Sequence, residues 1–587
     1  MKNVFYLIID AFCYNNLNRK IGNEFTTPFL RKLANEHTSI ENMYSQAPYT
    51  EAALVSLLSG ENTLERGGYL YGNKTVQNTI FRKYKNENYN IISQYAPYVY
   101  SKAYLKDVDV FFYTRLVNIE VLFNYRLSYY RTRYKKQELT NQELEVCIAL
   151  LREELETWIT QTEDLLANKE CCTLIKNWVC LENISEVHDK LKKEYLLFNN
   201  LPAKYIYNLF NNFDTNNLLN INRSYNEKNS IKNTDLLIEK YQSMLIEVQK
   251  KYNKIIKKDW PEWRYLFSTF FNKDNGFRDL KGLIHNYIRY YNNSFLESYI
   301  DSIDESSIVE VGMKRQLDYV LDLVDDSNNN GKPAFVYLQV QDFHLPTKFH
   351  SADYDDLDYV KREFEEALSL CKHIDDNYKG NILADLGARF CDSKIRELFN
   401  VLKSKYGDDF TLIISADHGY PSFFNPPRPY IYNQTYTEAF HIPFIIVDCD
   451  IKAKLSGFFS TMDFSKIVES KGRVKGREYI LTEYAGPGCP HISEKPIWYT
   501  YIDLNYRLSV ELMLGSKIDY GNIRSLYDLS SDPNEKINLV KQAHKISEVK
   551  RIMEIINNRN AELSAKFSGE KFLNFLNTNI TYDQDNL

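Results

Sequence analysis

Reactive side chains follow several apolar or helix-forming stretches of this chain. Asp10 ends the run NVFYLII, Thr50 precedes EAALVSLL, and the segments QDFHLP (341–346) and SADHGYP (415–421) each follow a further apolar run. Each alone has an ordinary explanation, because Asp and ADHG suit turns and Thr is a common helix N-cap. Together, carboxylates and imidazoles at several strand ends suit a divalent metal ion bound by oxygen and nitrogen. Such an ion could activate the Thr50 hydroxyl, and a helix N-terminus beside it favours a phosphate- or sulfate-like anion.

The elements that must position these residues have the pattern of a layered α/β fold. Continuous apolar runs of this kind predict strands buried on both faces. They occur at residues 3–9, 334–340, 410–416, 442–448 and 477–484. Amphipathic helical patterns lie between them at 27–37 and 392–407. We therefore expect ligands to bind beyond the carboxyl ends of the strands.

The segment from 105 to 320 has a different pattern. Its stretches 141–167 and 234–256 carry apolar residues at spacings of three and four, which indicates helices. This predicts a helical insertion, serving either as a structural bundle that could form a homo-oligomer or as a substrate-recognition cap. We expect an α/β catalytic domain in two parts, with the nucleophile in 1–104 and the metal ligands in 321–470. The helical insertion, 105–320, separates these parts, and a C-terminal α+β subdomain with a helical tail follows at 471–587.

Composition narrows the class of protein. The 587 residues exceed what one ordinary core needs, and a net charge of -6 gives no global basic field for nucleic acid. The nine cysteines form neither a disulfide framework nor a CxxC metal site. No apolar run approaches the roughly 20 residues that span a bilayer, and Asp10 interrupts the N-terminal run. We expect a cytoplasmic protein that has no transmembrane segment and does not bind nucleic acid.

Five segments resemble, in order and spacing, the sulfatase branch of the alkaline phosphatase superfamily. They are TTPFLRKLANEHTSIENMYSQAPYTEAALVSLLSG (26–60), KPAFVYLQVQDFHLP (332–346), TLIISADHG (411–419), HIPFIIVD (441–448) and SLYDLSSDPNEKINL (525–539). They look like the family's nucleophile, HxP, SDHG, RVPLII and ELYDLxxDPxExxNL segments. The likeness covers about 1–100 and 310–540 and leaves the helical insertion unmatched. It implies a mixed, mostly parallel sheet sandwiched by helices, with a smaller C-terminal α+β part.

The resemblance also implies roles for individual residues. Asp10, Asp417 and His418 would bind one or two divalent ions, and Thr50 would be the metal-bound nucleophile. His344 would contact the substrate anion or the leaving group. Carboxylate and imidazole ligands favour Zn²⁺ or Mn²⁺ over Mg²⁺ or Ca²⁺.

Three further residues are weaker candidates for substrate binding. His441 occupies a place where family members carry Arg or His near the anion. His491 and Glu483 border a Gly/Pro-rich loop after a predicted strand. Each has an ordinary alternative, as a strand end or a plain loop residue.

The departures from the family pattern bear on the reaction. Sulfatases carry a cysteine, matured to formylglycine, in C-x-P-x-R, where this chain has Thr50, Ala52 and Leu54. Formylglycine cannot be made from this sequence. The aspartate that commonly follows the first is Ala11 here, and nothing near IISQYAPYVY (91–100) resembles the family's GKWH segment. Threonine at the nucleophile position is what relatives acting on phosphorus show, and these pass a phospho group through a phosphothreonine.

Three functions follow as hypotheses. The first is transfer or hydrolysis of a phospho group through Thr50, with a small molecule or glycan as substrate and a surface-polysaccharide sugar, as in capsule synthesis, as one acceptor. The second is hydrolysis of a sulfuric or phosphate ester. The third is an inactive scaffold or binding protein that works through the helical insertion.

Overall fold

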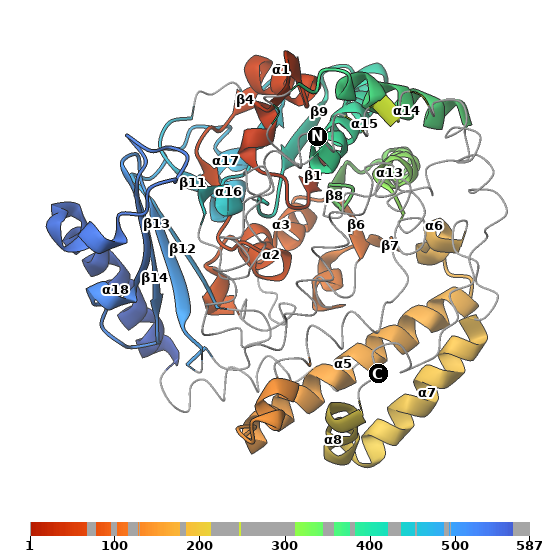
Figure 1. Ribbon diagram of the computed structural model, residues 1–587. Coiled ribbons are helices and arrows are strands. Elements are labelled where there is room, and N and C mark those ends of the chain that lie inside the picture. The colour runs from red at the N-terminus through yellow and green to blue at the C-terminus, as the bar shows by residue number, and fades with distance from the viewer. Residues whose placement is uncertain are drawn as a thin grey trace.

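A computed structural model of the protein is shown in Figure 1. It describes residues 2–66, 78–95, 102–114, 127, 130–176, 184–212, 243, 246, 247, 250, 311–343, 357–375, 378, 382–420, 436–451, 455–485, 492, 493 and 495–567.

A seven-stranded sheet forms the centre of the molecule. Its strands, in spatial order, are β4 (Thr38–Ser39), β10 (Phe444–Val447), β9 (Phe410–Ser415), β1 (Asn3–Ile9), β8 (Ala334–Val340), β6 (Asn90–Tyr95) and β7 (Val110–Tyr113). Only β10 runs against its neighbours, β9 and β4. All residues of β1, β8 and β9 are buried. The mixed, mostly parallel sheet is therefore as predicted, because apolar runs without alternation can only be satisfied when both faces are covered.

Helices cover the two faces of this sheet, and the alternation of side chains along β1 shows how. Tyr6 stacks on Phe464 of α17 (Phe464–Glu469), with ring centroids 4.2 Å apart. Its neighbours in sequence, Phe5 and Leu7, point the other way and line a small apolar cavity with residues of α13 (Met313–Asn329) and α15 (Ile382–Tyr406). The catalytic part is thus a three-layer sandwich.

The described residues contain further helices and short strands. The helices are α1 (Pro28–Glu36), α2 (Thr50–Ser59), α3 (Ile80–Asn86), α6 (Thr173–Lys176), α14 (Leu357–Cys371) and α16 (Thr437–Phe440). The strands are β2 (Lys20–Ile21), β3 (Glu24–Phe25), β5 (Met43–Tyr44) and β11 (Phe459–Ser460). These short strands form two two-stranded sheets, β2 with β3 and β5 with β11.

A second sheet occupies the C-terminal part. The strands β12 (Ile480–Ala485), β13 (Ile497–Ile502), β14 (Tyr506–Leu512) and β15 (Ile523–Asp528) pair antiparallel in sequence order. Helix α18 (Ser547–Phe567) packs on this sheet, at the blue end of the colour scale in Figure 1. The apolar run 477–484, whose pattern predicts a strand of the parallel sheet, instead forms β12, the first strand of this separate sheet. Short connections can join antiparallel strands, whereas consecutive parallel strands need a longer crossover connection.

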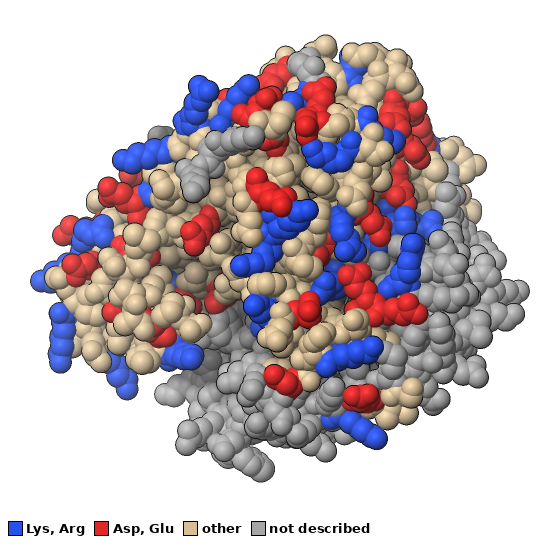
Figure 2. All heavy atoms as spheres, turned by 90° about the horizontal axis from the view of Figure 1, so that it is seen from above, with Lys and Arg blue, Asp and Glu red and all other residues tan. Residues whose placement is uncertain are grey.

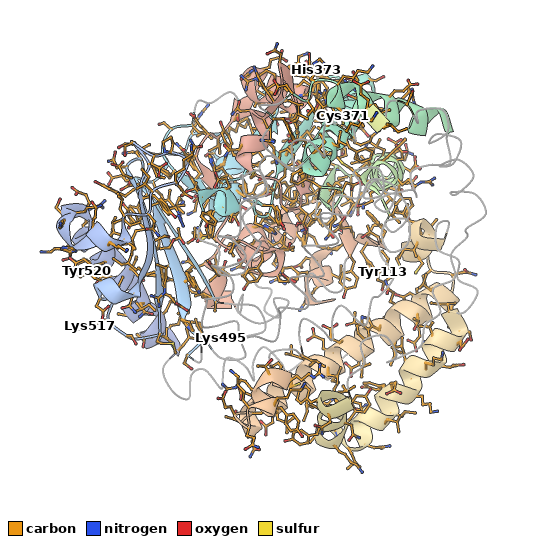
Figure 3. All side chains as sticks on the ribbon, in the orientation of Figure 1. Tyr113, Cys371, His373, Lys495, Lys517 and Tyr520 are labelled. Carbon is orange, nitrogen blue, oxygen red and sulfur yellow. The ribbon has the colours of Figure 1, made fainter. Side chains whose placement is uncertain are left out.

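The described part of the predicted insertion is largely helical. It contains α5 (Asn141–Leu166), α7 (Ile184–Asn200) and α8 (Pro202–Asn212), which lie together in Figure 1. Strand β7 also falls inside the range 105–320, yet it joins the central sheet. At that edge lies Tyr113, which is labelled in Figure 3. Its hydroxyl donates to Asp164 Oδ2 of α5 at 3.0 Å. The helical pattern at 234–256 lies outside the described residues, apart from four isolated positions.

Two surface properties complete the description. Lys and Arg are interspersed with Asp and Glu over the face seen in Figure 2. Within the described ranges, no helix is both long enough and apolar enough to cross a membrane.

Candidate metal centre and active site

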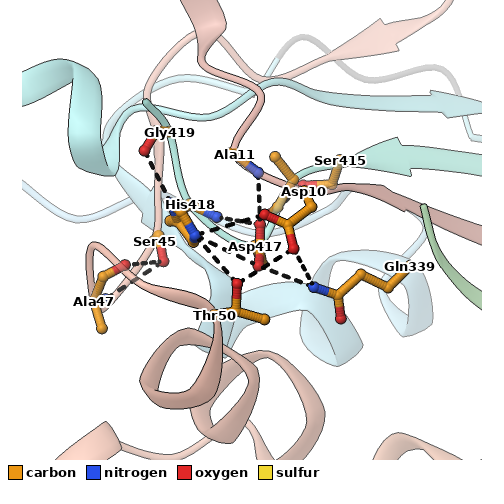
Figure 4. A network of polar contacts seen from close by, with 11 residues as sticks. Asp10, Ala11, Ser45, Ala47, Thr50, Gln339, Ser415, Asp417, His418 and Gly419 are labelled. Atoms are coloured by element: carbon orange, nitrogen blue, oxygen red, sulfur yellow. Dashed lines mark hydrogen bonds and ion pairs between the residues drawn. The ribbon is translucent and has the colours of Figure 1, made fainter. Parts of the chain in front are cut away.

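Neighbouring parallel strands bring the predicted ligands to one edge of the central sheet. The register of β1 and β9 sets Ile8 beside Ser415, and Asp10 and Asp417 follow two positions further along each strand. One oxygen of each carboxylate and one ring nitrogen of His418 all lie within 4.8 Å of one another (Figure 4). These three side chains are at most 2% exposed. The carboxyl ends of adjacent parallel strands thus assemble a compact, buried group of metal-ligand types.

Thr50 joins this group from the first turn of α2. Its Oγ1 donates to Asp10 Oδ2 at 3.3 Å and lies 3.3 Å from His418 Nε2. The N-cap of α2 is Tyr49, which makes no side-chain capping hydrogen bond, so Thr50 is not the N-cap. The hydroxyl therefore faces the carboxylates and the imidazole, at a helix N-terminus whose dipole favours an anion.

The backbone fixes the tautomer of His418. Its Nδ1 lies 2.9 Å from the Gly419 carbonyl oxygen, to which it donates. In the neutral ring this leaves the lone pair of Nε2 directed at the carboxylates, the arrangement typical of metal-binding histidines. Burial alone would lower the pKa of His418, but Asp417 and Asp10 raise it, and the net pKa stands above its ordinary value.

Asp417 is held by backbone donors. Its Oδ1 accepts from the N–H groups of Ala11, at 3.1 Å, and His418, at 2.8 Å. Ala11 adopts a φ of +62°, a left-handed conformation that is strained for a residue with a Cβ. Burial and the Asp10 carboxylate nevertheless raise the pKa of Asp417 to about 6. The negative charge on one carboxylate opposes ionisation of the other. A divalent cation bound between them would neutralise both charges.

Gln339 is a functional candidate that sequence reasoning missed. It lies on β8, is 1% exposed, and its Nε2 donates to Asp10 Oδ2 at 3.1 Å and to Asp417 Oδ2 at 3.0 Å. One amide group therefore bridges both carboxylates without adding charge. One signal in the sequence could have indicated Gln339, because it is the lone polar residue near the end of the apolar run AFVYLQV. A strand pattern alone predicts only that such a residue is part of the core.

The residues present fit a divalent ion. Two carboxylates, one imidazole nitrogen and one hydroxyl converge. The His418 tautomer leaves the Nε2 lone pair directed at the carboxylates. Asp10, Asp417, His418 and Thr50 would hold the ion, and this donor set suits Zn²⁺ or Mn²⁺. A bound ion would supply Lewis-acid polarisation and lower the pKa of a hydroxyl.

The other predicted residues are placed differently or not described. His344 and His491 lie outside the described residues. The ring of His441 lies between those of Tyr14 and Tyr44, with centroids 4.4 and 4.8 Å away. Its Nε2 donates to the Glu41 carbonyl oxygen at 2.6 Å, and burial lowers its pKa to about 4. These contacts give the ring a packing role.

Glu483 lies on β12 rather than beside the carboxylates. Both of its oxygens accept from Arg559 of α18, at 2.6 and 2.7 Å. Burial raises its pKa, although Arg559 opposes this. The pair joins α18 to the C-terminal sheet.

Comparison with known families shows the family of this chain. The family model described as Sulfatase matches residues 2–161 and 206–468, which is more than half of the chain. The chain belongs to the sulfatase family. The fold and the family are those of the sulfatase branch of the alkaline phosphatase superfamily, whose members are generally metal-dependent. Membership supports a hydrolase of the sulfatase type. A search of the curated proteins finds no match.

Solved structures of sulfatases resemble the chain at low sequence identity. The putative sulfatase yidJ from Bacteroides fragilis is 12% identical with a TM-score of 0.46, covering 99% of this chain and 98% of its own. The sulfatase PsFucS1 from Pseudoalteromonas sp. is 13% identical with a TM-score of 0.45, covering 95% and 91%. BT4656, solved with D-glucosamine-2-N,6-O-disulfate, is 14% identical with a TM-score of 0.42, covering 96% and 98%.

Proposed function

We propose that this sulfatase-family chain is a metal-dependent enzyme that transfers or hydrolyses a phospho group through a covalent intermediate on Thr50. The observation that carries the proposal is the position of the Thr50 Oγ1, 3.3 Å from both Asp10 Oδ2 and His418 Nε2 at the start of α2. A half-buried hydroxyl beside a divalent-ion site is a nucleophile that the ion would activate by lowering its pKa.

The reaction has two steps. In the first, the Thr50 Oγ1 attacks phosphorus, the bond from phosphorus to the leaving oxygen breaks, and the leaving oxygen takes a proton. The hydrogen bond from Thr50 to Asp10 gives the hydroxyl proton a path away from the attacking oxygen. In the second step, water or another hydroxyl attacks phosphorus, the bond to the Thr50 oxygen breaks, and Thr50 regains its proton. His344 remains our candidate for contact with the leaving group.

Charge explains why the site suits this chemistry. Asp10 and Asp417 would hold the ion, which would supply positive charge to the phosphoryl oxygens, and the N-terminus of α2 favours the same anion. Gln339 holds the two carboxylates in place through its two N–H groups. Water and a sugar hydroxyl would compete for one intermediate, so transfer and hydrolysis differ only in the acceptor.

Hydrolysis of a sulfuric ester is a second candidate, and family membership favours it. Against it stands Thr50 at the position where sulfatases carry formylglycine. The choice of substrate distinguishes the two candidates. The kcat/KM values for an aryl phosphodiester and for an aryl sulfate are compared with Mn²⁺ present. Sulfate release at the higher kcat/KM would replace the first proposal with the second. Failure to bind Mn²⁺ or Zn²⁺ at all would favour the inactive scaffold instead.

The decisive experiment is mass mapping of the intermediate. Wild type, Thr50→Ala and the control Ser59→Ala, at the far end of the same helix, are incubated with Mn²⁺ and an activated aryl phosphodiester. We expect a phospho-type adduct on the Thr50 peptide in wild type and in the control. In Thr50→Ala we expect no adduct and a kcat lower by about 10³-fold or more. Equal activity in all three proteins would refute the assignment of Thr50.

A further inference from the structure

Residues 436–442, the junction segment, connect the C-terminal sheet with every loop that carries a candidate ligand. Its contact with the first loop is a hydrogen bond from the Tyr14 N–H to the His441 carbonyl oxygen at 2.8 Å. Its contact with the nucleophile loop is one from the Ser45 N–H to the Phe440 carbonyl oxygen at 2.7 Å. Two segments far apart in sequence, the loop after β1 and the loop before α2, therefore depend on one short stretch of backbone.

The third contact is the closest to a metal ligand. The Gly419 N–H donates to the Ala439 carbonyl oxygen at 3.0 Å, and the Gly419 carbonyl oxygen accepts from His418 Nδ1. A Cβ on Gly419 would lie 1.8 Å from the Glu438 carbonyl oxygen. The junction segment thus packs backbone to backbone against the residue that fixes the His418 ring. Displacing the segment must displace Gly419, because there is no space between them.

Glu535 anchors the junction segment from the C-terminal part. Its carboxylate accepts from the Thr437 Oγ1 at 2.5 Å and from the Thr437 N–H at 3.2 and 3.3 Å. Glu535 is 3% exposed, and the fully buried Arg507 of β14 lies 3.3 Å from its Oε1 and compensates its charge. Glu535 adopts a φ of +51°, a left-handed conformation that is strained for a residue with a Cβ.

We propose that Glu535 is a positioning residue for the metal centre, acting through Thr437 and the junction segment on Gly419 and His418. This inference rests on the proposed function, because it concerns the same metal site. It assigns a physical role to the DPNE sequence at 532–535, which lies outside the catalytic sandwich. The C-terminal sheet would then be needed for metal affinity, and not only for stability.

Metal binding without substrate tests the inference. Mn²⁺ dissociation constants are measured by calorimetry for full-length wild type, Glu535→Ala and Thr437→Val, well below the unfolding temperature of each. The control is Asp532→Ala, which removes an acceptor of the Ile537 N–H in the same loop, at 2.7 Å. We expect a dissociation constant about 10-fold higher for Glu535→Ala and Thr437→Val, as for residues that orient a metal ligand without contacting the ion, and little change for the control. Thr437→Ser, which keeps the hydroxyl, should restore wild-type affinity.

Each outcome separates this inference from the proposed function. Wild-type Mn²⁺ affinity in folded Glu535→Ala would overturn the inference and leave the proposed function standing, since Glu535 would then serve stability alone. If Glu535→Ala does not fold, the milder Thr437→Val decides, and wild-type affinity there overturns the inference. Wild type that binds no Mn²⁺ would refute the metal site, and the inference with it.

Discussion

Replacing Asp417 by Asn should stabilise the metal-free protein, because Asp10 and Asp417 are buried like charges. The candidate ligand atoms of the cluster lie within 4.8 Å, which corresponds to about 3 kcal/mol of repulsion at an effective dielectric constant of about 20. The pKa of Asp417, raised to about 6 from 3.8 by burial and by Asp10, gives a similar value of about 3 kcal/mol. The asparagine amide group would place an N–H donor against the Gln339 N–H, which now donates to Asp417 Oδ2. Loss of this hydrogen bond costs about 1 kcal/mol. The expected net gain is about 2 kcal/mol.

The pH dependence provides a control within the same pair of proteins. Because the pKa of Asp417 is raised, the folded state holds this proton more tightly than the unfolded chain does. The associated stability is present below about pH 4 and is lost as the pH rises through about 6. The advantage of Asp417→Asn over wild type should therefore be small near pH 4.5 and fully developed near pH 7.5.

The assay is thermal unfolding in a chelating buffer and again with saturating Mn²⁺. Without metal, we expect Asp417→Asn to unfold a few degrees above wild type near pH 7.5. With Mn²⁺, wild type should gain stability through binding while the variant gains little. A variant no more stable than wild type in the chelator, at every pH, would refute the electrostatic reasoning.

Three further predictions test the surroundings of the site. Gln339→Leu removes the amide that bridges both carboxylates, so the Mn²⁺ dissociation constant measured by calorimetry should rise about 10-fold; unchanged affinity would contradict a positioning role. Gly419→Ala should lower the free energy of unfolding by about 2 kcal/mol or more, measured in urea, because its Cβ overlaps the Glu438 carbonyl oxygen. His441 has its pKa lowered to about 4, so its contribution to stability is present above about pH 6.5 and is lost as the pH falls toward 4. His441→Phe should therefore flatten the acid limb of the stability curve by about 3 kcal/mol, and an unaltered limb would count against this account.

The sequence by itself determined the main strands and the residues that end them. The apolar runs at β1, β8 and β9 each require burial on both faces, which only the interior of a sheet supplies. Asp10 and Asp417 follow two of these runs directly, so their place at the carboxyl edge followed from chain order alone. Local patterns carry this information because a strand and the residue after it are adjacent in the chain.

Only the tertiary structure decided which partners each side chain has. Gln339 meets Asp10 across 329 positions of sequence, and Glu535 meets Thr437 across 98, distances over which hydrophobic periodicity carries no information. The same holds for Glu483, which had the sequence context of a pocket residue but pairs with Arg559 of α18. Because these side chains are buried, each charge or amide needs a hydrogen-bonding partner, and only the folded chain brings that partner close.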